Sequence, residues 1–263
     1  MDLKLKDKVI VVTGGSKGIG NGICNLLAKE GAIPIIIGRN KPNILDAVKA
    51  IKDNGGQAFH AFAELTDKEA CKKAIDDVIK EFGRIDGLVN NAGVNDGVGL
   101  ENGNYDDFMV SIQRNVAHYY AMAQFALPEL KKSKGAIVNI GSKTSFTGQG
   151  GTSGYAAANG ARNALTREWA VELLPFSIRV NAVIVAECFT PLYKKWLDTF
   201  PNPEEKLNGI TKHIPLENRM TTATEIANAV LFLLSETSSH TTGQLLFVDG
   251  GYTHLDRALN ANN

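Results

Sequence analysis

The stretch "SGYAAANGARNALT", residues 153 to 166, holds two side chains whose types and spacing could serve proton transfer. Tyr155 and Asn159 are four residues apart, so in a helix they lie on one face, one turn from each other. A tyrosine that acts as an acid or a base needs a positive charge nearby, because a free phenol has a pKa of about 10 and is almost wholly protonated at neutral pH. Asn159 carries no charge. The stretch is therefore either an active site that lacks one component or an ordinary helix.

A glycine-rich turn follows the first predicted strand. The segment "TGGSKGIG", residues 13 to 20, opens into a helix and carries Gly14, Gly18 and Gly20. Glycines allow a tight turn there and let a pyrophosphate approach the amide groups at the helix N-terminus. Because the turn lies between the first strand and the first helix of a βαβ unit, it is a strong signal for a dinucleotide site.

The end of the second predicted strand reads "IIIGRN" and bears on the choice of dinucleotide. An acidic residue at this place would bind the ribose 2′-hydroxyl and repel a 2′-phosphate, whereas a basic one accommodates the phosphate. Gly38 holds the acidic position, Arg39 follows it, and Lys17 in the glycine turn is a second cation. This predicts a preference for NADP(H). If both cations are solvated surface charges, NAD(H) binds as well.

Short β-branched runs alternate with amphipathic stretches of helical length, which is typical of βαβ units and a parallel sheet. Strands are predicted over residues 8–14, 33–38, 58–64, 86–92, 135–142, 177–185 and 244–250. Helices are predicted over residues 18–30, 41–54, 67–82, 105–132, 154–174 and 222–236. No linker or change in composition divides the chain. The pattern predicts an α/β fold in which residues 1–263 form one doubly wound domain.

Residues 186–221 interrupt this alternation. The segment follows the sixth predicted strand and carries one Trp, one Tyr, two Phe and four Pro. Loops at the carboxyl ends of the strands form the binding crevice of an open α/β sheet, so this insert is predicted to cover the substrate. The alternative is a surface excursion that packs its own aromatic side chains.

Composition indicates an ordinary globular protein. Of 263 residues, 44% are hydrophobic and 21% charged, and 28 basic residues balance 28 acidic ones. A nucleic-acid-binding protein would usually show a basic excess or stripe, so no nucleic-acid partner is expected. The longest apolar run is too short to span a bilayer and the start lacks the apolar centre of a signal peptide, so we expect no membrane association and a cytoplasmic location.

The cysteines and histidines give no sign of a metal site or a disulfide. Cys24, Cys71 and Cys188 form neither a CxxC pair nor an even set, so reduced thiols are expected. The five histidines are isolated, with none at metal-ligand spacing. No metal is expected.

Five motifs in order give the chain a family resemblance: "TGGSKGIG", "NNAG" at 90–93, Asn115, "VNIGS" ending in Ser142, and Tyr155 thirteen residues later. With them the chain resembles the short-chain dehydrogenases/reductases over nearly its full length, to "GQLLFVDGG" at 243–251. The resemblance implies a single Rossmann-type NAD(P)-binding domain with helices on both faces of the sheet, usually in a homotetramer. It also implies hydride transfer between a nicotinamide and an alcohol or carbonyl. The helices at 105–132 and 154–174 would form the interface.

The resemblance assigns functions to individual residues. Tyr155 would be the general acid/base, Ser142 would hydrogen-bond the substrate oxygen, and Asn115 would hold a water that links the site to solvent. Asn90 would stabilise the sheet beside the cofactor. The implied cofactor-binding residues are Gly14, Ser16, Lys17, Gly18, Ile19, Gly20, Arg39, Asn40, Glu64, Leu65, Asn91, Ala92, Gly93, Tyr155, Asn159, Cys188 and Thr190.

Two positions depart from the family pattern. The usual Pro-Gly pair after the sixth strand reads Val185-Ala186, and the family has a lysine where this chain has Asn159. That lysine holds the nicotinamide ribose and helps to lower the pKa of the tyrosine. General acid/base catalysis is typically worth about 10²- to 10⁴-fold. We therefore expect oxidation to be slower by an amount in that range at neutral pH and partly restored at high pH.

Three explanations of Asn159 compete. The chain could be a disabled copy of an otherwise intact enzyme, which the otherwise complete set of catalytic positions favours. It could be a working enzyme in which another cation, such as Lys143, or a chain of waters replaces the lysine. It could also be a non-catalytic protein that binds NADP(H) or serves as a subunit partner.

Within the family, "GSKTSFTGQGGTSGY", "AECFTPLY" and "LLFVDGGYTHLDRAL" resemble bacterial sugar dehydrogenases of the L-fucose dehydrogenase type. A site for a sugar must pair many hydroxyl groups. The motifs place four polar residues beside Ser142 and Tyr155, and these are the predicted substrate contacts: Lys143, Thr144, Gln149 and Glu187. The predicted reaction is oxidation of an L-fucose-like aldose to a lactone. Reduction of another carbonyl, of ketoacyl or steroid type, is the alternative.

Overall fold

The computed structural model describes residues 2–255, and its centre is one sheet of seven parallel strands in the order β3-β2-β1-β4-β5-β6-β7. The strands are β1 (Val9–Thr13), β2 (Ile33–Gly38), β3 (Phe59–Phe62), β4 (Gly87–Asn90), β5 (Ala136–Ser142), β6 (Arg179–Val185) and β7 (Leu245–Val248). This confirms the predicted seven-stranded parallel sheet. The last residues of the C-terminal motif, 256–259, lie outside the described residues.

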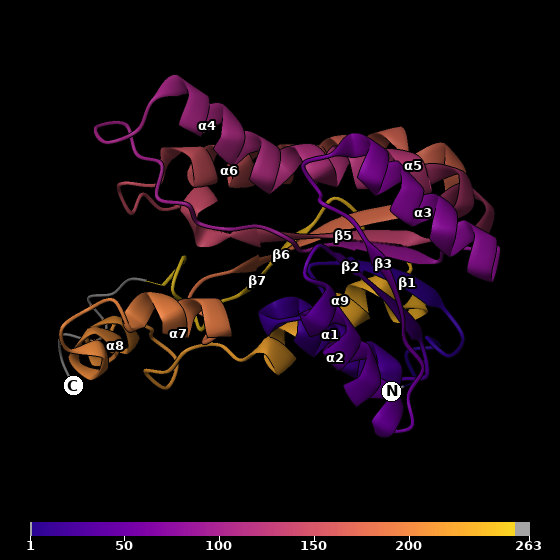
Figure 1. Cartoon of the computed structure of the whole chain (residues 1–263), viewed down its shortest axis with the longest axis horizontal. Coiled ribbons are helices and arrows are strands. Elements are labelled where there is room, and N and C mark those ends of the chain that lie inside the picture. Colours follow the sequence, from indigo (N-terminus) through magenta and orange to yellow (C-terminus); the bar gives the residue numbers. More distant parts are fainter. Residues whose placement is uncertain (1, 256–263) are drawn as a thin grey trace.

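Helices cover both faces of the sheet, as the prediction required (Figure 1). On one face lie α1 (Gly18–Lys29), α2 (Lys41–Asp53) and α9 (Ala223–Leu234). On the other lie α3 (Lys68–Phe82), α4 (Tyr105–Ile112), α5 (His118–Ser133) and α6 (Ser153–Glu172). The fold is therefore of the Rossmann type.

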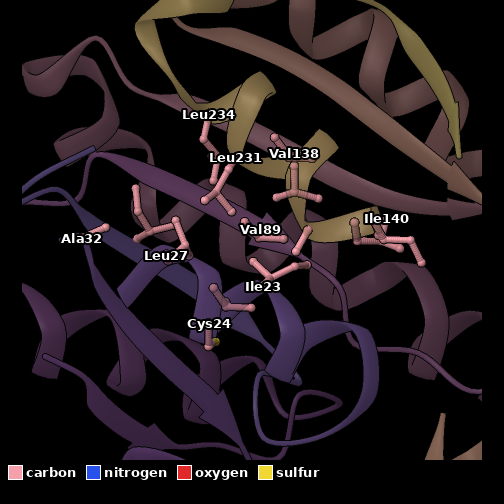
Figure 2. Packing of buried hydrophobic residues seen from close by; sticks show 14 of the residues in the cluster. Ile23, Cys24, Leu27, Ala32, Val89, Val138, Ile140, Leu231 and Leu234 are labelled. Carbon is pink, nitrogen blue, oxygen red and sulfur yellow. The ribbon is translucent and has the colours of Figure 1, made fainter. Parts of the chain in front are cut away.

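Each central strand contributes to two hydrophobic cores, because successive side chains of a strand point to opposite faces. In β1, Ile10 and Val12 pack with one cluster, while Val9 and Val11 pack with the other. Figure 2 shows part of the first cluster, where side chains of α1 and α9 meet those of β4 and β5. Burial on both faces explains the nearly continuous apolar runs in these strands.

Two segments differ from the predicted helices. The helix expected over 105–132 is divided by a π-helical turn, Gln113–Ala117, between α4 and α5. The insert at 186–221 contains two short helices, α7 (Pro191–Leu197) and α8 (Pro203–Thr211). Within residues 2–255, no helix is long and apolar enough to cross a membrane.

The strand order reverses between β1 and β4, and this reversal positions the site. Open α/β sheets bind their ligands beyond the carboxyl ends of the strands at such a reversal. The glycine turn follows β1, the "NNAG" segment begins at the end of β4, and Ser142 ends β5.

Candidate active site

The glycine turn has the geometry of a phosphate cradle. Gly14 has φ 67°, a conformation that glycine adopts without steric cost. A Cβ at Gly20 would lie 2.4 Å from the carbonyl oxygen of Gly14, so the turn closes only with glycine there. Lys17, which precedes α1, is extended and makes no side-chain cap to the helix among the described residues. The amide groups of the first turn are thus free of side-chain acceptors, and these residues fit a dinucleotide pyrophosphate.

Hydrogen bonds fasten the "NNAG" segment to the glycine turn. Thr13 Oγ1 accepts from the backbone amides of Asn91 at 2.9 Å and Ala92 at 3.1 Å, and Asn91 Nδ2 donates to the Thr13 carbonyl at 2.8 Å. Asn90 is fully buried and donates to Asn139 Oδ1 at 3.0 Å, which ties β4 to β5. These bonds fix the ends of β1, β4 and β5 relative to one another.

Arg39 and Glu64, both predicted at the cofactor, contact each other. Arg39 Nη1 lies 2.9 Å from Glu64 Oε2, and the two side chains are 78% and 43% exposed. Burial alone would raise the pKa of Glu64, but hydrogen bonds from Arg39 and Thr66 lower it below its usual value. The guanidinium that was expected to meet a 2′-phosphate therefore already has a carboxylate partner. Asn40 caps α2 by accepting from the amide of Asn43 at 3.1 Å.

The start of the insert lies against the glycine turn. A Cβ at Gly18 would be 3.2 Å from Thr190 Cγ2, so these two segments touch. Thr190 also caps α7, accepting from the amide of Tyr193 at 3.2 Å. Cys188 is buried and forms an isolated parallel bridge with Thr221.

A buried polar cluster follows Ser142. Ser142 Oγ accepts from Thr144 Oγ1 at 3.1 Å, and Lys143 forms an ion pair with Glu187. Glu187 Oε2 also accepts from the Tyr193 hydroxyl at 2.8 Å. Burial first, and then the Glu187 charge, raise the pKa of Tyr193, so its hydroxyl stays protonated and donates.

Three of the four predicted substrate contacts thus gather at the ends of β5 and β6. Lys143, Thr144 and Glu187 are buried or half-buried there. Gln149 is separate: it lies in an exposed loop before α6.

Residues 153–166, with Tyr155 and Asn159, lie in α6, and the buried face of this helix holds Asn159. Tyr155 is half-buried, whereas Asn159 is 0% exposed. Asn159 Nδ2 donates to the Tyr155 carbonyl at 2.8 Å, and its Oδ1 accepts from Arg162 Nη1 at 3.0 Å. Arg162 was not among the predicted site residues. The signal that could have found it is its spacing of three residues from Asn159, which places both on one helical face.

Asn115 lies within the π-helical turn. Its Oδ1 accepts from the amide of Val94 at 2.8 Å, and its Nδ2 donates to the Ser111 carbonyl at 3.0 Å. Its own carbonyl accepts from Arg162 through Nε at 2.7 Å and Nη2 at 2.5 Å. Asn115 therefore joins the "NNAG" strand end to α6. That it holds a water stays a prediction.

The remaining groups that could react or bind a metal are the three cysteines and the His, Asp and Glu side chains. Cys24, Cys71 and Cys188 are all free and buried. Burial raises the pKa of Cys71 to about 11 and that of Cys188 to about 12, so both are unreactive thiols at neutral pH. Across residues 2–255, no group of three or more His, Cys, Asp or Glu side chains could hold a metal ion.

A parallel sheet with this reversal of strand order and a glycine turn before α1 defines a dinucleotide-binding protein of the Rossmann type. The family model described as "Enoyl-(Acyl carrier protein) reductase" matches residues 14–253. The chain belongs to the short-chain dehydrogenase/reductase family and is an oxidoreductase of that family, which binds NAD(P)(H).

Relatives of the chain act on different substrates. Cyclopentanol dehydrogenase of Comamonas testosteroni is 35% identical over 251 residues, 95% of this chain and 98% of that protein. The 3-oxoacyl-[acyl-carrier-protein] reductase FabG of Thermotoga maritima is 34% identical over 95% of this chain and 99% of its own length. L-Fucose dehydrogenase of Bos taurus is 31% identical over 95% of this chain and 91% of its own length.

Solved structures show the same fold. The chain is 49% identical to Cj0485 dehydrogenase, with a TM-score of 0.95 and 99% of each chain covered. For the aldohexose dehydrogenase of Thermoplasma acidophilum the identity is 31% and the TM-score 0.87, over 97% of this chain and 98% of that one. L-Sorbose reductase of Gluconobacter frateurii, solved with NADPH and L-sorbose, is 25% identical to this chain. The TM-score is 0.92, and the match covers 97% of this chain and 100% of that one.

Proposed function

We propose that this oxidoreductase oxidises a hydroxyl group of a sugar, converting an L-fucose-like aldose to a lactone. The observation that carries the proposal is the buried cluster of Lys143, Glu187 and Tyr193 beside Ser142. The names of three similar proteins support it, because L-fucose dehydrogenase, aldohexose dehydrogenase and L-sorbose reductase all act on sugars.

The cluster suits a ligand with several hydroxyl groups. Lys143 and Glu187 have side chains that are only 9% and 13% exposed, so their charges are desolvated and fixed by each other. A sugar hydroxyl both donates and accepts, and can bond to the ammonium and to the carboxylate at once. A ligand without hydroxyls would leave these buried polar groups with no added partner, which is how such sites discriminate.

Ser142 and Tyr155 are proposed to act on the reacting hydroxyl. Ser142 accepts two hydrogen bonds from Thr144, so its own proton is free to point toward the substrate oxygen. Tyr155 would accept the proton of the substrate hydroxyl, and a nicotinamide, when bound, would accept the hydride from the carbon that carries this hydroxyl. The glycine turn and the start of α1 hold the pyrophosphate, so that the cofactor is fixed relative to Tyr155.

NADP(H) is the proposed cofactor, with NAD(H) as the alternative. Gly38 leaves the end of β2 without a carboxylate that would repel a 2′-phosphate, and Arg39 follows it. The exposed pair between Arg39 and Glu64 is weak, because surface ion pairs contribute about 0–1 kcal/mol. A doubly charged phosphate would therefore compete well for the guanidinium.

The insert at 186–221 is proposed to cover the substrate of a single domain formed by residues 1–263. Glu187 of the insert pairs with Lys143, which follows β5, so the insert reaches the polar cluster, and Tyr193 of α7 donates to the same carboxylate. The alternative, a surface excursion that packs its own aromatic side chains, also has support. The Trp196 ring packs edge-to-face against Tyr193 and Phe200, with ring centroids 5.2 and 4.9 Å apart.

Glu187→Gln tests the proposed substrate. Initial rates are measured with L-fucose, D-arabinose and cyclopentanol, each with NADP⁺ and NAD⁺. Loss of a hydrogen bond to a charged group costs about 1.5–3 kcal/mol, so KM for the sugars should rise about tenfold or more, while cyclopentanol oxidation changes little. The control is Glu204→Gln, an exposed residue of α8. Oxidation of cyclopentanol but no sugar, or equal effects on both, would contradict a sugar substrate.

A further inference from the structure

Arg162 carries a positive charge into the interior of the protein, beneath the site. Its side chain is 2% exposed. Among the described residues it forms no salt bridge: its donors reach the carbonyls of Asn115 and Ile140 and the Oδ1 of Asn159, all neutral acceptors. The guanidinium carbon also lies 4.3 Å from the centre of the Tyr119 ring.

This arrangement is unusual for a residue that serves packing alone. A buried charge is strongly destabilising unless it is paired, and an apolar side chain of similar size would fill the space without that cost. The neutral acceptors satisfy the N–H groups of Arg162 but leave its net charge in place. Buried charges without a charged partner are found more often at functional sites than in ordinary cores.

Tyr155, Asn159 and Arg162 share one face of α6, because spacings of four and three residues return to the same side of a helix. Side chains on a helix tilt toward its N-terminus, so a long side chain at 162 covers the turn that contains 158 and 159. A Cβ at Gly93 would be 2.7 Å from Arg162 Nη2, which places the guanidinium directly under the "NNAG" segment. The bond to Asn159 Oδ1 completes the link to α6.

We propose that Arg162 replaces the missing cation of this site, as a positioning residue that orients Asn159 and favours the phenolate form of Tyr155. The proposal rests on the proposed oxidoreductase function and favours a working enzyme over a disabled copy. Lys143, the other candidate for the cation, is paired with Glu187.

Asn159 and Arg162 are complementary as a pair. The Asn159 amide accepts from Arg162 and donates to the Tyr155 carbonyl, so both of its ends are used. A lysine at 159 would place a second cation close to the guanidinium, where like charges repel. A single Asn159→Lys change should therefore bring no gain in rate while Arg162 is present.

Several titratable groups surround the guanidinium, and the Tyr155→Phe reference separates the signal of Tyr155 from theirs. His118 and Tyr119 of α5 face the guanidinium; burial, and then the Arg162 charge, lower the pKa of His118 to about 4, and burial raises the pKa of Tyr119. Asp96 is hydrogen-bonded to Ser111, and on the Ser142 side Lys143 and Tyr193 share Glu187.

The test measures the phenolate of Tyr155 without cofactor or substrate. Ultraviolet absorbance is titrated with pH for the natural chain, Arg162→Met and Arg162→Lys, each against the same protein carrying Tyr155→Phe. An opposite charge at close range moves such a titration by about 1–3 pH units. The Met variant should form its phenolate at a pH at least about one unit higher, and the Lys variant should fall between. Coincident titrations of the natural chain and the Met variant would overturn the proposal.

Rates give a second readout. Arg162→Met should slow sugar oxidation at neutral pH, about tenfold for every pH unit by which phenolate formation moves upward, with recovery at high pH. The double variant Asn159→Lys with Arg162→Met should restore the rate. The control, Arg167→Met, removes an exposed charge of the same helix and should change nothing.

The possible results distinguish failure of the role proposed for Arg162 from failure of the proposed oxidoreductase function. If Arg162→Met does not fold, Asn159→Lys decides, because a tenfold faster Lys variant would contradict the proposal. A natural chain that turns over no sugar, alcohol or ketone would refute the proposed function, while the absorbance titration would still decide on Arg162.

Discussion

Asn159 is fully buried, and its amide is held by the carbonyl of Tyr155 on one side and by the guanidinium of Arg162 on the other. Taken alone, an asparagine at this position predicts slow proton transfer. Taken with Arg162, it is one half of a buried polar pair, and the proposed role of Arg162 is to supply the charge that Asn159 lacks. The chemistry of position 159 therefore depends on a residue one helical turn away.

The pair between Arg39 and Glu64 leads to a prediction on cofactor choice. Arg39→Ala should lower the ratio of kcat/KM for NADP⁺ to that for NAD⁺ about 10- to 100-fold, because a charge-assisted hydrogen bond is worth about 1.5–3 kcal/mol. Glu64→Gln frees the guanidinium and should raise the ratio. Steady-state kinetics with both cofactors measure it, and Lys49→Ala on the exposed side of α2 is the control. An unchanged ratio in Arg39→Ala would show that Arg39 does not meet the 2′-phosphate.

Residue types and their spacing predicted much of the site, but they did not show in which direction each side chain points. Gly14, Ser142 and Tyr155 could be placed because each belongs to a motif with fixed spacing along the chain. Arg162 was not placed, although it is three residues from Asn159, since an arginine in an Ala-rich helix normally faces solvent. Only the packing of α6 against β5 and the π-helical turn shows that this side chain points inward.

The faces of α4, α5 and α6 that point away from the sheet carry exposed apolar side chains. Tyr105 is 75% exposed, Tyr120 53% and Val171 66%. Apolar groups gathered on one face of a protein favour association with another protein surface. Together with the family resemblance, this supports the proposal that the chain forms a homotetramer through these helices.

Light scattering tests the proposed assembly. The natural chain should give a mass of about four times the 28.3 kDa of one chain. Val171→Glu should lower the mass, because a buried unpaired charge in an interface is unfavourable. Leu45→Glu on α2, which is 48% exposed on the opposite face of the sheet, is the matched control. A monomeric natural chain would exclude the tetramer.

The sequence pattern predicted the positions of the helices better than the irregular turn between two of them. Strands and most helices were predicted to within a few residues, because short β-branched runs alternate in the sequence with amphipathic stretches of 3.6-residue repeat. The π-helical turn at Gln113–Ala117 was missed, since one residue added to a helical turn hardly alters an apolar pattern. This turn positions the Asn115 carbonyl that receives Arg162.

For the whole molecule, one sheet brings distant residues to a single edge. Gly14, Asn91, Ser142 and Glu187 come from four different chain segments and meet near the carboxyl ends of β1, β4, β5 and β6. The fold class could be predicted because every strand between two helical layers must be apolar on both faces. The substrate could not be derived in the same way, since it depends on side chains in the irregular insert at 186–221.

Tyr155 is proposed to transfer the proton in a nicotinamide-dependent oxidation. The most direct measurement is the initial rate of NADP⁺ reduction with L-fucose, followed by nicotinamide absorbance from neutral to alkaline pH, for the natural chain, Tyr155→Phe and the exposed control Tyr105→Phe. We expect turnover by the natural chain and by the control, and a rate at least about 100-fold lower in Tyr155→Phe, because general acid/base catalysis contributes about 10²- to 10⁴-fold. Equal rates in the natural chain and Tyr155→Phe would contradict the assignment of Tyr155.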